Sequence, residues 1–376
     1  MVTPNTRHSG NYDVKHQLGI KVPLQPNELI SSWLVRTALI HSCDPLVLTG
    51  EVWGTWRVWT IDSDRIYADA LLQPISNTSS IPVKSFKEMS LYPIAKAIIG
   101  DTPPQKIVWP WILALGARNT KRNGGLQYCP LCLADDAKPH FKRQWRFAWH
   151  TACDKHQCLL LDRCHVCNSP IEPHRLIAED QQITICATCK TDLSTATLKE
   201  LCLESLAFQR LADKIIQTGH GEFQQQIVSI PDWFKLSDFF ASMLRRANRG
   251  RTVILQDFLS QITRLLPNNF PIRTGAGIEL LHTNERQTIF GSLHQIMTFN
   301  KEDFERIALK SNITRQSFCS KDEVLPVILK PLYEKLPDNP KLRSRKIKRS
   351  PFLPRPKHEV LRMMARLERK LEMAQR

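Results

Sequence analysis

Four short pairs of metal-binding residue types lie between residues 129 and 189, and they decide how the middle of the chain folds. In order, the pairs are Cys129-Pro130-Leu131-Cys132, Cys153-Asp154-Lys155-His156, Cys164-His165-Val166-Cys167 and Cys186-Ala187-Thr188-Cys189. Twenty residues (133–152) separate the first two pairs, and 18 (168–185) separate the last two. Two thiolate or imidazole ligands placed two residues apart reach neighbouring corners of a tetrahedron, so two such pairs complete a zinc site. We predict two structural zinc ions per chain, one bound by three cysteines and a histidine and one by four cysteines.

Other uses of these cysteines fit the sequence less well. Disulfides need an oxidising compartment, but the first ten residues, MVTPNTRHSG, lack the apolar segment of a secretion signal. A thioredoxin-like redox pair needs a strand–helix–strand context, which the flanking residues do not show. Cys158 and His165 lie inside the stretch and could replace a ligand, although the even spacing of the pairs argues against it. Because each set fills four positions, a structural role is favoured over a catalytic one.

The composition favours a globular chain with a polyanionic partner. The 376 residues are 42% hydrophobic and carry a net charge of +16, and they suffice for two or three domains. No apolar run approaches the roughly 18 residues of a membrane span, so we expect a cytoplasmic protein with no membrane partner. From Lys341 to Arg376 there are 13 Lys and Arg against 3 Asp and Glu, which leaves only +6 for the other 340 residues. A tail that serves solubility alone is one explanation, but the imbalance favours nucleic-acid binding through Lys341, Arg343, Arg345, Lys346, Lys348 and Arg349.

The apolar periodicity predicts a mainly α protein with small β zinc-ribbon modules. We expect an N-terminal helical domain of helix-turn-helix character, tandem structural zinc sites and a C-terminal helical domain. The predicted parts are a flexible N-terminal arm (1–20), the N-terminal helical domain (21–120), the zinc-binding module (121–195), the C-terminal helical domain (196–340) and a basic tail with a short amphipathic helix (341–376).

Two segments near the predicted metal sites carry more specific predictions. A helix is expected after Pro26, with Asn27 as its N-cap and apolar residues at three- and four-residue steps from Ile30. Aromatic residues alternate with charged ones from Phe141 to Trp149. This alternation predicts a strand that packs one face beside the metal and exposes charge on the other. Aromatic residues interleaved with arginines also suit stacking on nucleic acid, but a core role is favoured because a small zinc module needs those rings as its core.

Two further segments have competing interpretations. Asp62 and Asp64 have the spacing of a metal-binding pair, but no other acidic residues cluster nearby, so helix-capping carboxylates are favoured. In the C-terminal half, a helix at 301–309, a short turn and a helix from Thr314 to Ser320 have helix-turn-helix proportions. Arg315 would then contact DNA from the recognition helix, although many helical hairpins share this length.

The first half of the chain resembles the TniQ/TnsD family of transposon target-selection proteins. The family motif E-x-x-x-S-W-L-x-R-x-A is matched by Glu28, Ser32, Trp33, Leu34, Arg36 and Ala38. The family motif W-x-x-D-x-D-R is matched by Trp59, Asp62, Asp64 and Arg65. The metal-binding pairs, with Arg143, Trp145 and Arg146 between the first two, are also close to the family pattern, so the resemblance covers roughly residues 20 to 195.

This resemblance implies an adaptor and not an enzyme. Family members recognise a target and recruit an AAA+ ATPase regulator, which in turn brings the transposase. Longer, TnsD-like members read an attachment-site DNA sequence directly, whereas shorter members dock onto a CRISPR Cascade-type effector with its guide RNA. Some members act as dimers, so a homodimer is a candidate assembly. The modest C-terminal half favours docking. The sequence has no G-x-x-x-x-G-K-[ST] loop for ATP hydrolysis. From another class, a zinc-containing DNA nuclease or recombinase is the alternative, although three acidic residues for two-metal strand transfer cannot be identified by their spacing.

Overall fold

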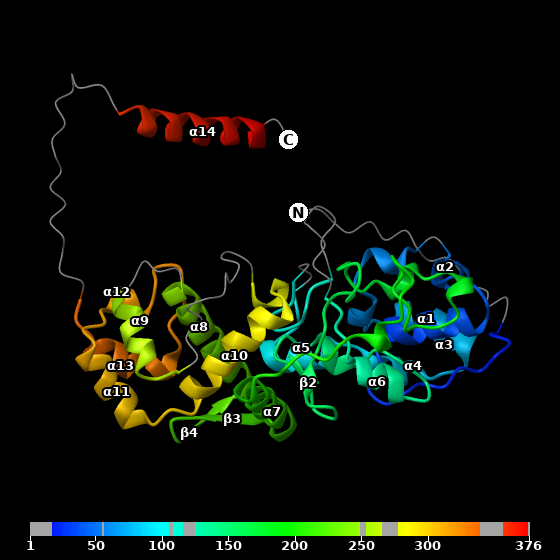
Figure 1. The fold of residues 1–376 in the computed structure, drawn as a ribbon, viewed down its shortest axis with the longest axis horizontal. Helices are drawn as coiled ribbons and strands as arrows, with labels where there is room; N and C mark the ends of the chain where they lie inside the picture. The colour runs from blue at the N-terminus through cyan, green and yellow to red at the C-terminus, as the bar shows by residue number, and fades with distance from the viewer. Residues whose placement is uncertain are drawn as a thin grey trace. The chain divides into compact units, whose positions relative to one another are not determined.

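The computed structural model of the chain describes residues 17–54, 56–104, 108–115, 125–248, 253–264, 277–338 and 356–374. Two compact units divide the chain: the body, Met1–Pro337, and a C-terminal unit, Asp338–Arg376. Figure 1 shows the elements of both units. Most of the predicted N-terminal arm lies outside the described residues.

The body is built mainly from helices, as the sequence predicts. Its α-helices are α1 (Ile30–Ile40), α2 (Pro45–Trp53), α3 (Asp69–Ser79), α4 (Val83–Met89), α5 (Tyr92–Ile99), α6 (Pro130–Asp135), α7 (Leu203–Thr218), α8 (Ile230–Asn248), α9 (Val253–Ser260), α10 (Thr283–Met297), α11 (Lys301–Lys310), α12 (Arg315–Phe318) and α13 (Lys330–Lys335). Short 3-10 helices are η1 (Val58–Thr60), η2 (Ser63–Arg65), η3 (Arg143–Arg146), η4 (Pro173–Arg175), η5 (Ala178–Asp180), η6 (Leu193–Thr195), η7 (Ile278–Leu280) and η8 (Val327–Leu329). None of the described helices combines the length and the hydrophobicity needed to cross a membrane.

Four short strands form two separate antiparallel hairpins. They are β1 (Ala152–Cys153) with β2 (Cys158–Leu159), and β3 (His220–Phe223) with β4 (Gln226–Ser229). In the second hairpin Phe223 pairs with Gln226, so only Gln224 and Gln225 form the turn. Their φ angles are 49° and 65°, as a two-residue type I′ turn requires. The sequence offers no Asn-Gly or Asp-Gly signal here, which explains why this hairpin was not expected.

Helix α1 is the centre of the N-terminal part of the body. All of its residues from Ile30 to Leu39 are buried, because α2, η2, η4 and η5 contact it from different sides. The predicted Asn27 cap is wrong: Asn27 has φ 57°, and the helix begins after Leu29 without a side-chain cap. The backbone here pairs with a distant segment instead, since Arg143 N–H donates to Asn27 O at 2.6 Å.

The segment from Phe141 to Trp149 is not the predicted strand. Four of its residues form η3, and Arg146 is fully buried where an exposed charge was expected. The segment lies between several neighbours, because Lys142 forms a bridge with Glu28 and a second bridge joins 112 to 147. Packing against several neighbours therefore replaces the one-sided packing of a strand. The aromatic side chains are buried, as their core role predicts: Phe141, Trp145, Phe147 and Trp149.

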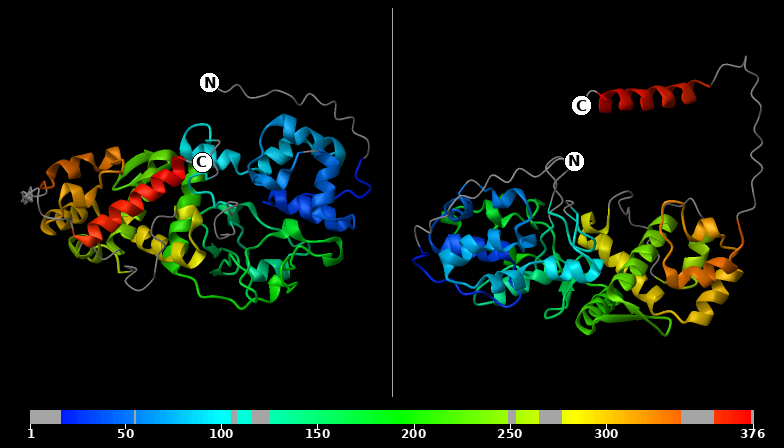
Figure 2. Two further views of the ribbon diagram at one scale, coloured as in Figure 1. Left: turned by 90° about the horizontal axis from the view of Figure 1, so that it is seen from above. Right: turned by 180° about the vertical axis from the view of Figure 1, so that it is seen from behind.

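The larger of two hydrophobic clusters among the described residues runs through most of the body, from Leu29 to Leu336. The smaller one holds the N-terminal helices together around Trp33 and Phe86. Members of the larger cluster include Cys129, Cys164 and Cys186, so the cysteine-rich region packs as part of the body's main core. Figure 2 shows the N-terminal helices (blue) and α11–α13 (orange) at opposite ends of the body in both views. The cysteine-rich region packs beside the N-terminal helices, since η4 and η5 contact α1.

Buried polar contacts join the helices after residue 200 to the cysteine-rich region. The guanidinium of Arg286 in α10 is buried and donates to Ala148 O at 2.5 Å and to Gln127 Oε1 at 2.8 Å. Asp213 in α7 accepts hydrogen bonds from Trp149 Nε1 at 2.8 Å. These contacts span more than 60 residues in sequence, so the two regions depend on each other.

The C-terminal unit contains α14 (Lys357–Ala374). The helix agrees with the predicted short amphipathic helix, and its apolar residues Val360, Met364 and Leu367 are 38%, 52% and 59% exposed. The basic segment before it, 341–355, lies outside the described residues.

Candidate metal centres

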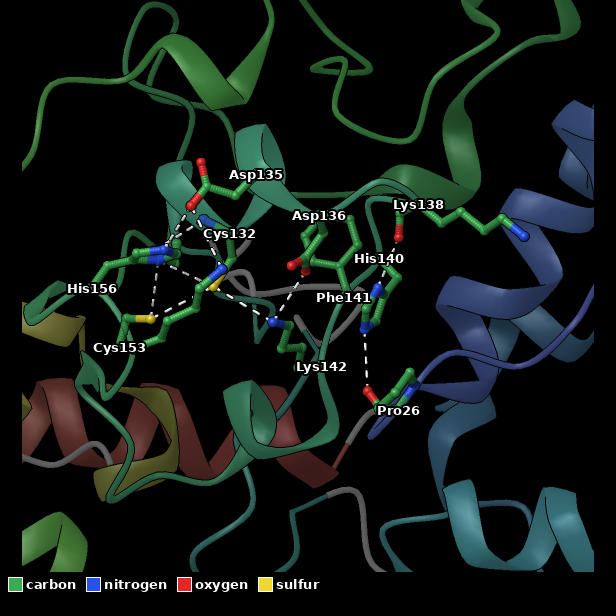
Figure 3. Close-up of polar contacts among 12 residues, drawn as sticks. Pro26, Cys132, Asp135, Asp136, Lys138, His140, Phe141, Lys142, Cys153 and His156 are labelled. Atoms are coloured by element: carbon green, nitrogen blue, oxygen red, sulfur yellow. Dashed lines mark hydrogen bonds and ion pairs between the residues drawn. The ribbon is translucent and has the colours of Figure 1, made fainter.

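Cys129, Cys132, Cys153 and His156 form the first centre, and their ligand atoms all lie within 4.8 Å of one another. Cys129 precedes α6 and Cys132 lies in its first turn, where the Cys132 N–H donates to Cys129 Sγ at 3.4 Å. Cys153 ends β1, and His156 lies in the turn to β2. His156 Nδ1 is 3.3 Å from Cys129 Sγ, 3.4 Å from Cys132 Sγ and 3.6 Å from Cys153 Sγ. Nδ1 is therefore the ring nitrogen that faces the sulfurs (Figure 3).

Cys164, Cys167, Cys186 and Cys189 form the second centre. Its sulfur atoms approach in two cross pairs, Cys164 with Cys189 at 3.6 Å and Cys167 with Cys186 at 3.7 Å. Cys164 and Cys186 are buried, whereas Cys189 is exposed. The second centre therefore lies closer to solvent than the first.

The same backbone turn presents three of the four ligand pairs. In each, the N–H of the residue after the second ligand donates to the carbonyl of the first: Gln157 to Cys153 at 2.8 Å, Asn168 to Cys164 at 3.0 Å and Lys190 to Cys186 at 2.9 Å. These three donor residues have φ angles of 47°, 55° and 63°. Residues other than glycine adopt this region rarely, so its repetition indicates one turn used three times to aim two ligands at a common point.

The donor chemistry and spacing fit a tetrahedral metal ion. A zinc–sulfur distance of about 2.3 Å places two sulfurs of a tetrahedron roughly 3.8 Å apart, and the close pairs here are 3.6–3.7 Å apart. Hydrogen bonds from Cys129 and Cys132 lower the pKa of Cys153 to about 2, while those with Cys129 and Cys153 raise the pKa of Cys132. Thiols this close therefore cannot all ionise by themselves, and a divalent cation that binds them as thiolates removes the conflict.

Two charged side chains contact ligands of the first centre. Asp135 lies 3.0 Å from His156 Nε2, so its carboxylate can hold the ring with Nδ1 toward the sulfurs. Lys142 Nζ lies 3.5 Å from Cys132 Sγ and 3.1 Å from Asp136, as Figure 3 shows. Sequence reasoning missed both roles, because ligand spacing identifies the ligands and not the groups that the fold places around them.

The two alternative ligands considered from the sequence are placed differently. Cys158 Sγ lies 3.6 Å from Cys129 Sγ but is outside the four-ligand group. His165 is exposed and belongs to neither group. The structure thus groups the same eight residues that the even spacing favoured.

The first family motif forms a buried polar network at the start of α1. Glu28 accepts hydrogen bonds from Arg36 Nε at 2.7 Å and from Ser32 Oγ at 3.0 Å. Ser32 Oγ in turn accepts the N–H of Phe141 at 2.9 Å. The motif residues therefore join α1 to the segment that follows the first ligand pair.

Arg146 joins the second family motif to the same segment. Its guanidinium lies 2.5 Å from Asp62 and 2.8 Å from Asp64, and Asp64 also accepts both the N–H and the hydroxyl of Ser31. Burial raises the pKa of Asp64 to about 6. At Asp62 burial also acts to raise the pKa, but the charges of Arg146 and Arg65 and the hydrogen bonds from Arg146 and the Asp64 N–H together lower it. Asp62 also caps η2 through the N–H of Asp64, which confirms its capping role. Because both carboxylates contact Arg146, the alternative metal-binding interpretation is disfavoured.

The C-terminal half does not present the expected recognition helix. Helix α11 matches the first predicted helix within one residue, but α12 contains only four residues after its cap Thr314. The Arg315 guanidinium donates to the carbonyls of Tyr333 at 3.2 Å and Glu334 at 2.7 Å. One helical turn is too short to lie along a major groove, and Arg315 contacts the chain's own backbone. The other predicted nucleic-acid contacts lie outside the described residues: Lys341, Arg343, Arg345, Lys346, Lys348 and Arg349.

The described residues define a mainly helical protein with two tetrahedral-type metal-ligand clusters in its core. The family model described as TniQ matches residues 20–160, which supports a TniQ/TnsD-like protein. The match includes the first centre and both polar networks and ends before the second centre. No curated protein matches the chain. The TniQ domain supports a role in target selection during DNA transposition.

Proposed function

We propose that this chain is a non-enzymatic adaptor that selects target sites in DNA transposition by linking a DNA target, or an RNA-guided CRISPR effector complex, to an AAA+ ATPase regulator and the transposase. The TniQ match over residues 20–160 carries the proposal. The polar networks support it, because Glu28, Asp64 and Arg146 are buried and paired with other side chains. These residues act as a scaffold and are not exposed to a substrate.

We infer that the metal in both centres is zinc in a structural role. Thiolate-rich tetrahedral sets favour zinc, and each set fills all four positions. Metal analysis of protein purified without added zinc should find two zinc ions per chain. Fewer than one ion, or iron in place of zinc, would contradict the assignment.

The decisive test of the adaptor role is assembly. The full chain should associate with the AAA+ regulator encoded beside it when ATP and either target DNA or the CRISPR effector are present. Association should be measured by co-purification, with each component left out in turn. If the regulator fails to associate under every combination, the adaptor proposal is wrong. Light scattering of the chain alone would report whether it forms the homodimer that the resemblance implies.

Docking onto a guided complex and direct reading of DNA predict different binding. A direct reader should prefer its site over random DNA by roughly 10³ or more. A docking subunit should bind DNA weakly. The logarithm of its affinity should fall linearly with the logarithm of the salt concentration, with a slope of about −0.9 for each neutralised phosphate. The described C-terminal half favours docking, because α12 is too short to read base edges.

Removal of the basic tail tests whether the tail contributes to DNA binding, both for a direct reader and for a docking subunit. The tail carries 13 of the 52 Lys and Arg residues, so a chain ending at residue 340 should bind DNA more weakly and with a shallower salt dependence. Unfolding of the body should be unchanged, because Met1–Pro337 forms its own compact unit. Unchanged DNA affinity would assign the tail to solubility.

A zinc-containing nuclease is the second candidate function, since Asp62 and Asp64 have the spacing of a metal-binding pair. Their contacts with Arg146 disfavour it. Labelled DNA incubated with the protein and Mg²⁺ or Mn²⁺ should remain intact. Metal-dependent cleavage that is lost in Asp62→Asn would favour the nuclease instead.

A further inference from the structure

Lys142 lies between the first metal centre and the segment that leads into helix α1. Its backbone forms the bridge with Glu28, and the adjoining Phe141 O accepts the N–H of Leu29 at 3.0 Å. Its side chain extends toward the metal ligands, with Nζ 3.5 Å from Cys132 Sγ. In Figure 3 the ammonium group lies between Cys132 and Asp136. The same residue therefore contacts the segment that leads into α1 through its backbone and the first centre through its ammonium.

The surroundings hold the Lys142 side chain in place. Nζ lies 3.1 Å from Asp136 Oδ2 and 5.6 Å from the centre of the Trp145 ring. The side chain is 18% exposed and that of Asp136 is 21% exposed. A lysine held by a carboxylate, an aromatic face and a cysteine sulfur has few other conformations available, so its approach to Cys132 is directed by the fold.

Charge explains why the first centre needs such a group. Three thiolates and one neutral imidazole around a divalent cation leave one net negative charge, and Cys129, Cys132 and Cys153 are all buried. An uncompensated charge in a protein interior is costly. A nearby ammonium stabilises a thiolate and donates a charge-assisted hydrogen bond to it. At the second centre, Cys189 is exposed, so water can solvate that centre's charge.

We propose that Lys142 is a positioning residue of the first metal centre: its ammonium donates to the metal-bound Cys132 thiolate, offsets part of the buried cluster's negative charge and ties metal binding there to the docking of residues 141–143 on residues 27–32. The proposal rests on the metal occupancy proposed above. It extends that proposal because the negative charge of the two centres is then stabilised in different ways, by a lysine at the first centre and by solvent at the second.

The test uses the full-length protein and three substitutions. Lys142→Met removes the charge and the donor, Lys142→Arg keeps both, and Lys155→Met is the matched control. Lys155 also lies beside the first centre, 3.6 Å from Asp135, but its side chain is 57% exposed. Competition with a chromophoric chelator measures the affinity of each centre for Zn²⁺. In Lys142→Met the affinity of one centre should fall by about 10- to 100-fold, while the other centre, Lys142→Arg and Lys155→Met should remain near wild type.

A spectroscopic measurement separates this role from general destabilisation. With Co²⁺ in place of Zn²⁺, the sulfur-to-metal charge-transfer bands report the charge on the thiolates. These bands should shift in Lys142→Met and return in Lys142→Arg, whereas a merely structural lysine would leave them unchanged. If Lys142→Met does not fold, Lys142→Gln, which keeps a donor without the charge, is compared with Lys142→Arg by both measurements.

The outcomes distinguish this proposal from the assignment of the metal itself. Wild-type protein without bound metal would overturn the metal centres and the role of Lys142 together. Wild-type protein with two ions, combined with unchanged affinity and bands in Lys142→Met, would overturn the role of Lys142 alone. Equal losses in Lys142→Met and Lys155→Met would overturn it too, because the effect would then belong to any charge near the centre.

Discussion

At the residue scale, Arg146 illustrates how the family motifs act in this chain. Its side chain and that of Asp64 are fully buried, and that of Asp62 nearly so. Arg146 lies more than 80 residues from both Asp62 and Asp64 in the sequence. Their ion pairs therefore fix the relative positions of η2 and η3, and the ion-pair partners depend on one another for solvation.

Substitution of Arg146 by methionine should destabilise the protein by about 3–5 kcal/mol, because two buried carboxylates lose their counter-charge. The measurement is the free energy of unfolding in urea. Arg210→Met is the control: Arg210 pairs with Asp154 at 2.9 Å but is 56% exposed, so its loss should cost at most about 1 kcal/mol. Comparable losses in the two variants would show that burial of the network contributes little.

Glu279 predicts a dependence of stability on pH. Its Oε1 accepts the N–H of Trp111, a residue with φ 63°, and burial raises its pKa from 4.5, with Asp238 adding to the rise and Arg245 opposing it. The folded protein therefore binds more protons than the unfolded chain above about pH 4.5, and this contribution to stability is lost as the pH rises through the folded pKa.

Glu279→Gln keeps a hydrogen-bond acceptor for Trp111 and removes the titration. Its free energy of unfolding should therefore fall less steeply than that of the wild type as the pH rises from about 4.5. Glu222→Gln, at an exposed strand position, should follow the wild-type profile. Parallel profiles for Glu279→Gln and the wild type would contradict the raised pKa.

The metal ligands could be predicted from sequence because their signal is local. A two-residue spacing and the chemistry of sulfur and imidazole identify a ligand pair without knowledge of the fold. Asp135 and Lys142 could not be found in this way, since each reaches its ligand only after α6 and the following segment have folded. Arg146 was part of the family resemblance, but its burial against Asp62 and Asp64 depends on contacts that no local pattern encodes.

At the scale of elements, local patterns predicted helices better than the segments between them. The mainly helical class, α11 and the amphipathic α14 agree with the sequence. The expected strand from Phe141 to Trp149 is wrong because alternation indicates a strand only where one face meets solvent, and this segment is packed on several sides. The expected second helix from Thr314 is shorter because Cys319 and Ser320 leave the helix after one turn.

The β3–β4 turn offers a test of local conformation. Gln225 is exposed and has φ 65°, which costs a residue with a side chain roughly 1 kcal/mol relative to glycine. Gln225→Gly should therefore stabilise the protein by up to about 1 kcal/mol, measured as the free energy of unfolding in urea. The same change one residue later, Gln226→Gly, lies in the strand and should destabilise it. Stabilisation by both substitutions would contradict the turn.

At the scale of the whole molecule, the metal centres belong to the main core. Cysteines of both centres belong to the hydrophobic cluster that reaches from Leu29 to Leu336. Removal of metal should therefore affect helices far from the ligands. A strong chelator should lower the thermal midpoint of the whole body and weaken association with the AAA+ regulator, and added Zn²⁺ should restore both.

Calorimetry and far-ultraviolet circular dichroism, recorded on the same metal-free sample, would test this prediction. An unchanged midpoint, or loss of the cysteine-rich region alone with the helices intact, would contradict it. Chelator added to Cys189→Ser provides a comparison, because that substitution weakens the exposed second centre and leaves the first complete.

The contacts of Arg286 and Asp213 have a consequence for how this chain could exchange parts with its relatives. The recognised TniQ segment stops at residue 160, yet Ala148, Trp149 and Gln127 find their hydrogen-bond partners in helices beyond residue 200. A gene fusion that inherits only the recognised segment would lose these hydrogen-bond partners and would expose core side chains such as Trp149, which packs against Phe234. A recombinant protein should therefore fold only when it also contains a compatible C-terminal helical half. The unit that can be exchanged between relatives is the entire body.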